Sequence, residues 1–340
     1  MTPARVCARC VLPESPPEIG LDDRGTCSVC HAWDREQAEE GVRAFHETDF
    51  TRILNQHRGK GPYDCLVMCS GGRDSTAALT YMVRRYRAKV LAFMFDHGFE
   101  TEEAVANVQR AVRILDVDFL QVRSTYMHGI FRAILETDAP AVICHVCSIW
   151  YMDLTFQMAD RFGIPLIVAG WTRGQSTHKP ILSKGGCDVS APEFRRMGMA
   201  TRAFLEQHVR FDPRYRDLPT SMEEVQRRAR KRRSALVLSP HWFLPHTGDD
   251  YEQTIRREVG WQAPESSYPK GSTNCALNFV SVWHSMRHYG YTHYHVEMSK
   301  LIRQGLLTRE EALDRLQIDF DPEMLDRIVA PLGVRCRSAR

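Results

Sequence analysis

The stretch Tyr63-Asp64-Cys65-Leu66-Val67-Met68-Cys69-Ser70-Gly71-Gly72-Arg73-Asp74-Ser75-Thr76 decides the fold. Its first half is an apolar run, which predicts a buried strand, and the residues from Thr76 to Tyr86 place apolar side chains at helical spacing. Two glycines between the strand and the helix let the backbone turn tightly and direct free N–H groups at an anion. The stretch therefore predicts a strand, a phosphate-binding loop and a helix.

The side chains of this loop support the same interpretation. Ser70, Ser75 and Thr76 add hydroxyl groups and Arg73 adds a cation. The spacing is not the G-x-x-x-x-G-K-[ST] pattern of P-loop NTPases, and an ordinary serine- and glycine-rich turn is the alternative. The loop resembles the PP-loop, SGG[K/R]DS, of the N-type ATP pyrophosphatases. That resemblance implies that ATP is split to AMP and pyrophosphate while a carbonyl-type oxygen becomes adenylated.

The resemblance also implies which residues hold ATP and Mg²⁺. The adenine would stack near Phe95 and Gly170, and Asp74 would either bind Mg²⁺ directly or hold the loop. The residues expected to hold the phosphates are Ser70, Gly71, Gly72, Arg73, Asp74, Ser75 and Thr76.

Strand and helix patterns alternate after the loop. Further apolar strands are predicted over 90–95, 118–122 and 165–170, with helices over 101–115, 127–136 and 149–161. This alternation predicts an α/β fold with a doubly wound parallel sheet, of the HUP/PP-loop type by resemblance. Ligands bind such sheets outside the carboxyl ends of the strands. The loop falls at that edge, together with Asp96, Ser124, Thr125, Gly170, Trp171 and Thr172.

The N-terminal segment carries two cysteine pairs, Cys7-x-x-Cys10 and Cys27-x-x-Cys30. Each pair forms a knuckle, and two knuckles close a tetrahedral site, so the spacing predicts a zinc ribbon with a structural role. Free thiols or redox pairs are the alternative. We predict four parts: a zinc ribbon over 1–35, a linker helix over 36–62, the PP-loop domain over 63–240 and a mostly helical C-terminal region over 241–340.

Composition indicates a protein without a membrane span or a signal peptide. The chain has 340 residues, a formal net charge of +3 and eleven cysteines. No apolar stretch approaches the roughly 18 residues of a membrane span, and the N-terminus lacks the apolar core of a signal peptide. Many cysteines without an export signal favour metal or redox chemistry in the cytoplasm. The basic run 227–233, on a predicted helix over 222–233, is interpreted as a solvated face, with nucleic acid or a phosphorylated substrate as alternatives.

A second cysteine set lies outside the ribbon. Cys144-x-x-Cys147 is placed between two predicted helices near the same sheet edge, and Cys275 lies in a later polar loop. The pair is interpreted as a redox dithiol, half of a zinc site, or part of a [4Fe-4S] cluster in which Cys275 is the third ligand. Three thiolates on such a cluster leave one iron free for an exogenous sulfur. Cys187 is a weaker third ligand, and His145, His293 and His295 are candidates for proton transfer.

Two family resemblances follow from these motifs. The opening Cys7-Ala8-Arg9-Cys10-Val11-Leu12-Pro13, the second knuckle, Tyr63-Asp64-Cys65 and the tail motif Thr308-Arg309-Glu310-Glu311 resemble the N-acetyl sugar amidotransferases of surface-polysaccharide synthesis. That family uses ammonia from a separate glutaminase. The order of zinc ribbon, PP-loop, C-x-x-C and one later cysteine is similar to the iron–sulfur tRNA thiolases, which replace a pyrimidine oxygen with sulfur.

Cys144, Cys147 and Cys275 separate the two resemblances, because ammonia needs no thiolate. We therefore expect an AMP-forming sulfurtransferase that uses a cluster or a persulfide on these cysteines. The alternatives are an amidotransferase and a non-catalytic zinc-ribbon binding module. The expected acceptor is a small molecule (a nucleobase, nucleotide or sugar) in preference to tRNA. The expected partner is a sulfur donor protein or a glutaminase, and a homodimer is left open.

Overall fold

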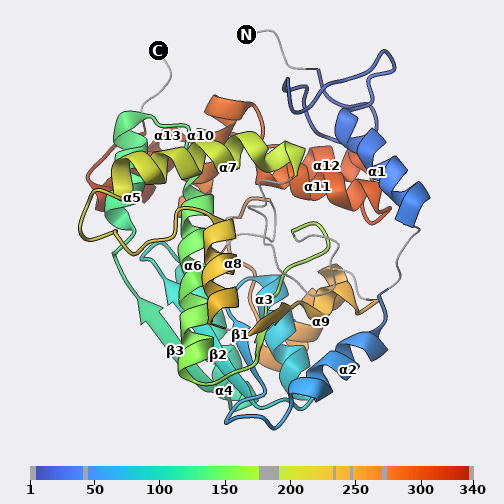
Figure 1. Cartoon of the computed structure of the whole chain (residues 1–340), viewed down its shortest axis with the longest axis vertical. Helices are drawn as coiled ribbons and strands as arrows, with labels where there is room; N and C mark the ends of the chain where they lie inside the picture. Colours follow the sequence, from blue (N-terminus) through green and yellow to red (C-terminus); the bar gives the residue numbers. More distant parts are fainter. Residues whose placement is uncertain are drawn as a thin grey trace.

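Five parallel strands form one sheet in the order β3-β2-β1-β4-β5 (Figure 1). The structure is a computed structural model, which describes residues 5–40, 45–175, 191–232, 235–245, 248–265, 267–269 and 274–336. The strands are β1 (Cys65–Met68), β2 (Val90–Asp96), β3 (Asp118–Arg123), β4 (Leu166–Val168) and β5 (Leu236–Leu238). All four strand pairings are parallel, which confirms the predicted α/β fold with a doubly wound sheet.

The central strands are buried on both faces, as covered parallel sheets require. Alternate residues enter different cores, because successive side chains of a strand point to opposite faces. Leu66 and Met68 join the core that contains residues of helices α5, α6 and α8. Cys65, Val67 and Cys69 join the core that contains residues of α2, α3, α4 and α9.

Helices cover both faces and one end of the sheet. Figure 1 shows α7 and α10–α13 gathered at the end of the molecule where α1 lies, with the sheet toward the other end. The α-helices are α1 (Ser28–Glu40), α2 (Glu47–His57), α3 (Arg73–Thr80), α4 (Glu102–Leu115), α5 (His128–Thr137), α6 (Ile143–Arg161), α7 (Pro192–Phe204), α8 (Met222–Lys231), α9 (Gly248–Val259), α10 (Leu277–Tyr289), α11 (His293–Arg303), α12 (Arg309–Arg315) and α13 (Pro322–Val329).

Three sequence-based expectations need correction. Strand β5 was not predicted, because its three residues are too few for a periodic signal. The predicted helix over 149–161 begins earlier, at Ile143, because the apolar side chains Ile143, Val146 and Ile149 are all buried. The predicted linker helix over 36–62 is not one helix: α1 starts within the second cysteine knuckle and ends at Glu40, and α2 starts at Glu47.

The C-terminal region is helical as expected. The motif Thr308-Arg309-Glu310-Glu311 has the spacing of a capping box, and the box is present. Thr308 Oγ1 accepts from the Glu311 N–H, and the Glu311 side chain accepts from the Thr308 N–H. In the part of the chain that the structure describes, no helix combines the length and the apolar character that crossing a membrane requires.

Candidate functional site

The loop between β1 and α3 has the backbone that its glycines predict. Gly71 adopts a φ of 76°, and a Cβ at this position would lie 2.0 Å from the carbonyl oxygen of Ala104. Only glycine fits here, since both the conformation and the space exclude a side chain. The Gly71 carbonyl accepts hydrogen bonds from Trp261 Nε1 at 2.9 Å and Asn107 Nδ2 at 3.3 Å. These contacts fix the path of the loop at the N-terminus of α3, where anions bind.

Hydrogen bonds of serine hydroxyls stabilise this loop. Ser70 Oγ and Ser75 Oγ lie 3.0 Å apart, and the Ser70 N–H donates to Ser75 Oγ at 3.2 Å. Gly170, after β4, lies so close that a Cβ there would be 2.5 Å from the Cα of Ser75. Thr76 is buried within α3. The loop between β1 and α3 therefore packs tightly against Gly170, just after the end of β4.

Charged side chains at the start of α3 face a carboxylate that the sequence interpretation missed. Arg73 Nε donates to Asp74 Oδ1 at 3.0 Å. Glu297, on α11, has its pKa raised to about 7 by burial and then by the charge of Asp74. Thr172 Oγ1 donates to Glu297 at 3.4 Å. No motif marks Glu297, because α11 reaches this edge only through the tertiary fold.

The end of β2 borders a cavity of about 730 Å³. Asp96 is buried, accepts from the Gly98 N–H at 2.7 Å and lies 3.5 Å from Arg123 Nε at the end of β3. The lining includes Asp96, Gly98, Glu100, Glu102, Gln121 and Arg123. The ring of Phe95 points instead into the core, near Tyr151 and His97. Its predicted place beside adenine stays a prediction.

The second cysteine set lies at this edge. Cys144 and Cys147 lie in the first and second turns of α6, not in a loop between helices. The Cys144 N–H donates to Ser281 Oγ at 3.2 Å, and burial raises the pKa of the Cys144 thiol to about 11. The pKa of Cys275 is raised well above its usual range by burial, and further by Glu100, Cys144 and Cys147. The three thiols are therefore within electrostatic range of one another.

A compact set of different donors surrounds Cys275. His97 Nε2 lies 3.6 Å from Cys275 Sγ and 3.3 Å from Glu100 Oε1, and the three atoms all lie within 4.8 Å of one another. Burial raises the pKa of Glu100 to about 8 and lowers the pKa of His97 to about 4. The sequence interpretation named neither His97 nor Glu100, although His97 directly follows the strand end at Asp96.

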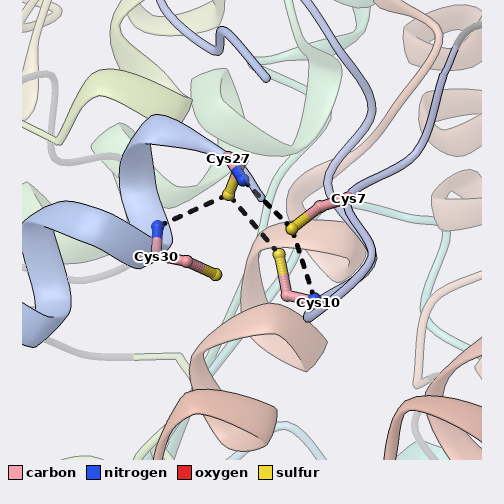
Figure 2. Close-up of side chains that lie close together, drawn as sticks. All are labelled: Cys7, Cys10, Cys27 and Cys30. Atoms are coloured by element: carbon pink, nitrogen blue, oxygen red, sulfur yellow. Dashed lines mark hydrogen bonds between the residues drawn. The ribbon is translucent and has the colours of Figure 1, made fainter. Parts of the chain in front are cut away.

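The four ribbon cysteines converge as predicted (Figure 2). All four are fully buried, and Cys10 Sγ lies 3.7 Å from Cys27 Sγ. Backbone N–H groups of Cys10 and Cys27 donate to Cys7 Sγ at 3.4 and 3.3 Å. Tetrahedral geometry with metal–sulfur bonds of about 2.3 Å sets neighbouring sulfurs about 3.8 Å apart, so the donors fit a zinc ion.

The histidines singled out for proton transfer have structural surroundings. His145 is buried beside Phe194, and burial lowers its pKa to about 3. His295 Nδ1 accepts from the Thr292 N–H in the capping box of α11. Burial lowers the pKa values of His293 and His295 to about 4. Cys187 and the loop Lys179–Asp188 lie outside the described residues.

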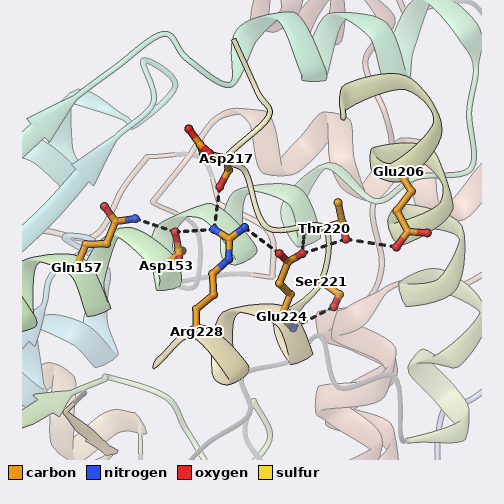
Figure 3. Close-up of polar contacts among 8 residues, drawn as sticks. All are labelled: Asp153, Gln157, Glu206, Asp217, Thr220, Ser221, Glu224 and Arg228. Atoms are coloured by element: carbon orange, nitrogen blue, oxygen red, sulfur yellow. Dashed lines mark hydrogen bonds and ion pairs between the residues drawn. The ribbon is translucent and has the colours of Figure 1, made fainter. Parts of the chain in front are cut away.

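The basic run on α8 is partly engaged within the fold (Figure 3). Arg228 donates to Glu224 Oε1 at 2.8 Å and lies 3.6 Å from the buried Asp153. Arg232 lies 3.9 Å from Asp160, whereas Arg227 is exposed. Part of this run thus binds α8 to α6.

No family model matches the chain. A Methanocaldococcus jannaschii protein named "Uncharacterized protein MJ1599" is 19% identical over 266 residues, which cover 78% of this chain and 76% of that protein.

Two solved structures are similar over most of the chain. The U34-tRNA thiolase NcsA from Methanococcus maripaludis, with its [4Fe-4S] cluster, has a TM-score of 0.38 and 13% identity, covering 93% of this chain and 90% of that one. The NMN synthetase of Francisella tularensis has a TM-score of 0.39 and 10% identity, covering 82% and 99%. At these values the likeness identifies no reaction, so function is argued from this chain's own residues.

Proposed function

We propose that this protein is an ATP-dependent, AMP-forming enzyme that replaces a carbonyl-type oxygen of its substrate with sulfur. The observation that carries the proposal is the common location of the glycine loop and three cysteines at the carboxyl edge of one parallel sheet. Open α/β sheets bind ligands at this edge. A phosphate-binding loop and a set of thiols there bring an activating group and a nucleophile to the same substrate.

The first half-reaction belongs to the loop. The N–H groups at the start of α3 and the hydroxyl of Ser70 would hold the pyrophosphate part of ATP·Mg²⁺, and Arg73 would offset its charge. The substrate oxygen attacks the α-phosphorus, the bond between the α-phosphorus and the bridging oxygen breaks, and pyrophosphate leaves. Positioning and charge neutralisation supply most of the rate enhancement for such a step.

The second half-reaction belongs to Cys144, Cys147 and Cys275. Their thiols are free of disulfides and interact electrostatically, so the donor set suits either a persulfide or an iron–sulfur cluster. A cluster held by these three would offer one iron without a cysteine ligand to an external sulfide. In both cases sulfur attacks the adenylated carbon, a carbon–sulfur bond forms and AMP leaves with the original oxygen. With a persulfide, whose outer sulfur would come from a persulfide of the donor protein, a second cysteine thiol then attacks the inner sulfur and breaks the sulfur–sulfur bond. The disulfide left between the two cysteines is reduced by an external thiol.

A small-molecule acceptor, a sulfur donor protein and a cytoplasmic setting complete the proposal. Isotope transfer tests it. The protein is incubated anaerobically with ATP·Mg²⁺, [¹⁵N]ammonium, a thiol reductant and the small-molecule fraction of a cell extract, with total tRNA in a parallel reaction. Sulfur is supplied as [³⁵S]sulfide in one set and as thiosulfate labelled with ³⁵S at its outer sulfur in another, because only the second can load a persulfide. We expect ³⁵S in a product, and no transfer by Cys144→Ser. Transfer of ¹⁵N without ³⁵S would replace the proposal with the amidotransferase reaction.

A further inference from the structure

Three side chains of different chemistry converge beside the cavity at the end of β2. His97 Nε2 lies 3.3 Å from Glu100 Oε1 and 3.6 Å from Cys275 Sγ. Together the nitrogen, oxygen and sulfur form one of the compact groups of ligand atoms among the described residues. Neither the ATP-binding loop nor the role given to the cysteines above uses His97 or Glu100.

The separations match those of ligands on one ion. Zinc bonds of about 2.0–2.1 Å to nitrogen, 2.0–2.2 Å to oxygen and 2.3 Å to sulfur, in tetrahedral geometry, place neighbouring donors about 3.3–3.6 Å apart. The two distances measured from His97 Nε2 agree with this range. The three cysteine sulfurs of the edge, by contrast, are not among the groups within 4.8 Å.

The arrangement does not suit a nucleophile relay. In a Cys–His–carboxylate relay the imidazole contacts the nucleophile through one nitrogen and the carboxylate through the other. Here Glu100 and Cys275 both face Nε2 of His97, and Nδ1 has no hydrogen-bond partner among the described atoms. Convergence on a single nitrogen is the geometry of ligands around a cation.

Burial makes a cation at this point favourable. The side chains of His97 and Glu100 are 4% and 7% exposed, and within the described part of the chain His97 is the only ion-pair partner of Glu100. A buried carboxylate beside a thiol is costly without a compensating positive charge. A divalent ion would supply that charge.

The backbone holds these ligands in place. Glu100 and Cys275 form an antiparallel bridge, the Thr101 N–H donates to Asn274 O at 3.0 Å, and the Ala276 N–H donates to Phe99 O at 2.8 Å. Asn274 Nδ2 also donates to Glu100 Oε2 at 3.2 Å, which leaves Oε1 directed at His97. Such outer hydrogen bonds orient metal ligands. Glu100 also lines the cavity, so a fourth ligand has access.

We propose that His97, Glu100 and Cys275 bind one divalent transition-metal ion of the zinc class, with Asn274 as a positioning residue and a fourth position open to the cavity. Three protein ligands with an open position are typical of a catalytic ion. Because this ion uses Cys275, sulfur would be carried by Cys144 and Cys147. That last consequence rests on the proposed function, whereas the ion site does not.

Metal binding to the full chain tests this site. Apo protein is prepared anaerobically with a chelator and a thiol reductant, titrated with Zn²⁺, desalted and analysed for metal. With one ion in the ribbon and one at the new site, we expect about two zinc ions per chain in the wild type and about one in Glu100→Gln and Cys275→Ser. The double variant Cys144→Ser/Cys147→Ser should keep about two. Asn274→Ala should bind the second ion about 10–100-fold more weakly.

The ribbon ion, retained in every variant, reports that each chain is folded. Uptake of the ribbon ion alone by the wild type would overturn the site. An iron–sulfur cluster would also overturn the site. Such a cluster would appear after anaerobic reconstitution as iron and acid-labile sulfide that are lost in Cys144→Ser/Cys147→Ser and retained in Glu100→Gln. Neither result would contradict sulfur transfer, which the isotope experiment measures separately. Conversely, binding of a second zinc ion without ³⁵S transfer would support the ion site and contradict the proposed sulfur transfer.

Discussion

The ribbon and the carboxyl edge of the sheet each contain a C-x-x-C pair, but different groups face their sulfurs. In the ribbon, four buried thiols converge on one another and accept backbone N–H groups. At the edge, Cys144 and Cys147 lie in the first two turns of α6, and Cys275 faces a histidine and a carboxylate. A closed set of four leaves an ion no free position, whereas a mixed set of three does. The same cysteine spacing thus lies in a closed four-cysteine group in the ribbon and outside any compact ligand group of the described residues at the edge.

Removing a ribbon ligand should give the largest loss of stability. The ribbon is tied to the C-terminal helices, because the Val11 N–H donates to Ser299 Oγ at 3.3 Å and Arg309 Nε donates to the Cys10 carbonyl at 3.0 Å. Structural zinc contributes about 10–16 kcal/mol of binding free energy in isolated fingers, so Cys27→Ser should cost roughly 5 kcal/mol or more. Thermal unfolding and zinc analysis measure the effect.

Cys336→Ser is the matched control, since Cys336 lies far from both cysteine sets in the sequence and belongs to no compact ligand group of the described chain. Its melting temperature should equal that of the wild type. Equal melting temperatures for Cys27→Ser and the wild type would show that the ribbon is not a structural site.

The ion pair between Arg228 of α8 and the buried Asp153 of α6 is a second cluster whose role is structural. Asp153 is 1% exposed and its carboxylate faces Arg228 (Figure 3). Breaking a buried pair on one side costs about 3–5 kcal/mol, and Arg228 is partly exposed, so Arg228→Ala should cost about 3 kcal/mol. Arg227→Ala removes the same charge from an exposed position and should change stability by less than about 0.5 kcal/mol. Equal losses would contradict this structural role, and so would equally weakened tRNA binding with unchanged stability in both variants.

A methyl group in the loop should separate activity from stability. Gly71→Ala places a Cβ 2.0 Å from the Ala104 oxygen, so the loop must shift and ATP turnover should fall at least about 100-fold. Gly163 also has a positive φ, but a Cβ there meets nothing within 4 Å. Gly163→Ala should therefore cost only about 1 kcal/mol of stability and leave turnover unchanged. Similar turnover in both variants would exclude the loop from the active site.

The smallest predicted effect concerns Glu297. Its pKa in the folded protein is raised to about 7, so above the unfolded pKa the unfolded chain binds fewer protons. Stability should therefore fall as the pH rises from about 4.5 to about 7. Glu297→Gln should remove this dependence and stabilise the protein at pH 8 by about 1–2 kcal/mol relative to the wild type. Denaturant unfolding at pH 5 and pH 8 measures both values, and a larger gain at pH 5 would contradict the assignment.

The sheet and the ribbon could be predicted because their signals are local. Each signal is made by residues that are close in the sequence. This holds for the apolar run over Cys65–Met68, for the glycine turn and for each of the two cysteine knuckles. The capping box at Thr308 is local as well. Strand β5 escaped prediction because three residues show no periodicity, and the start of α6 was misplaced because the cysteine pair was interpreted as a loop.

The candidate site was only partly predictable, since its members come from distant segments. Cys144, Cys147 and Cys275 were named for their chemistry, and the structure brings them within electrostatic range. Glu297 and Glu100 carry no motif: one reaches the edge on α11, and the other is fixed there by a bridge to Cys275. Contacts between residues that are far apart in the sequence produce no recognisable motif spacing, so they could not be predicted.

We propose that the loop supports adenylation of the substrate and that the thiols deliver the second nucleophile. Single turnovers with [γ-³²P]ATP, which labels pyrophosphate, and with [α-³²P]ATP, which labels the adenylate and AMP, separate the two half-reactions in the presence of the sulfur donor and the small-molecule fraction of a cell extract. Ser70→Ala and Asp74→Asn should release pyrophosphate at least about 100-fold more slowly, whereas Cys144→Ser/Cys147→Ser should release pyrophosphate at the wild-type rate but form neither AMP nor a sulfur-containing product. Pyrophosphate release at the wild-type rate in both loop variants, or its equal loss in the cysteine variant, would contradict this division.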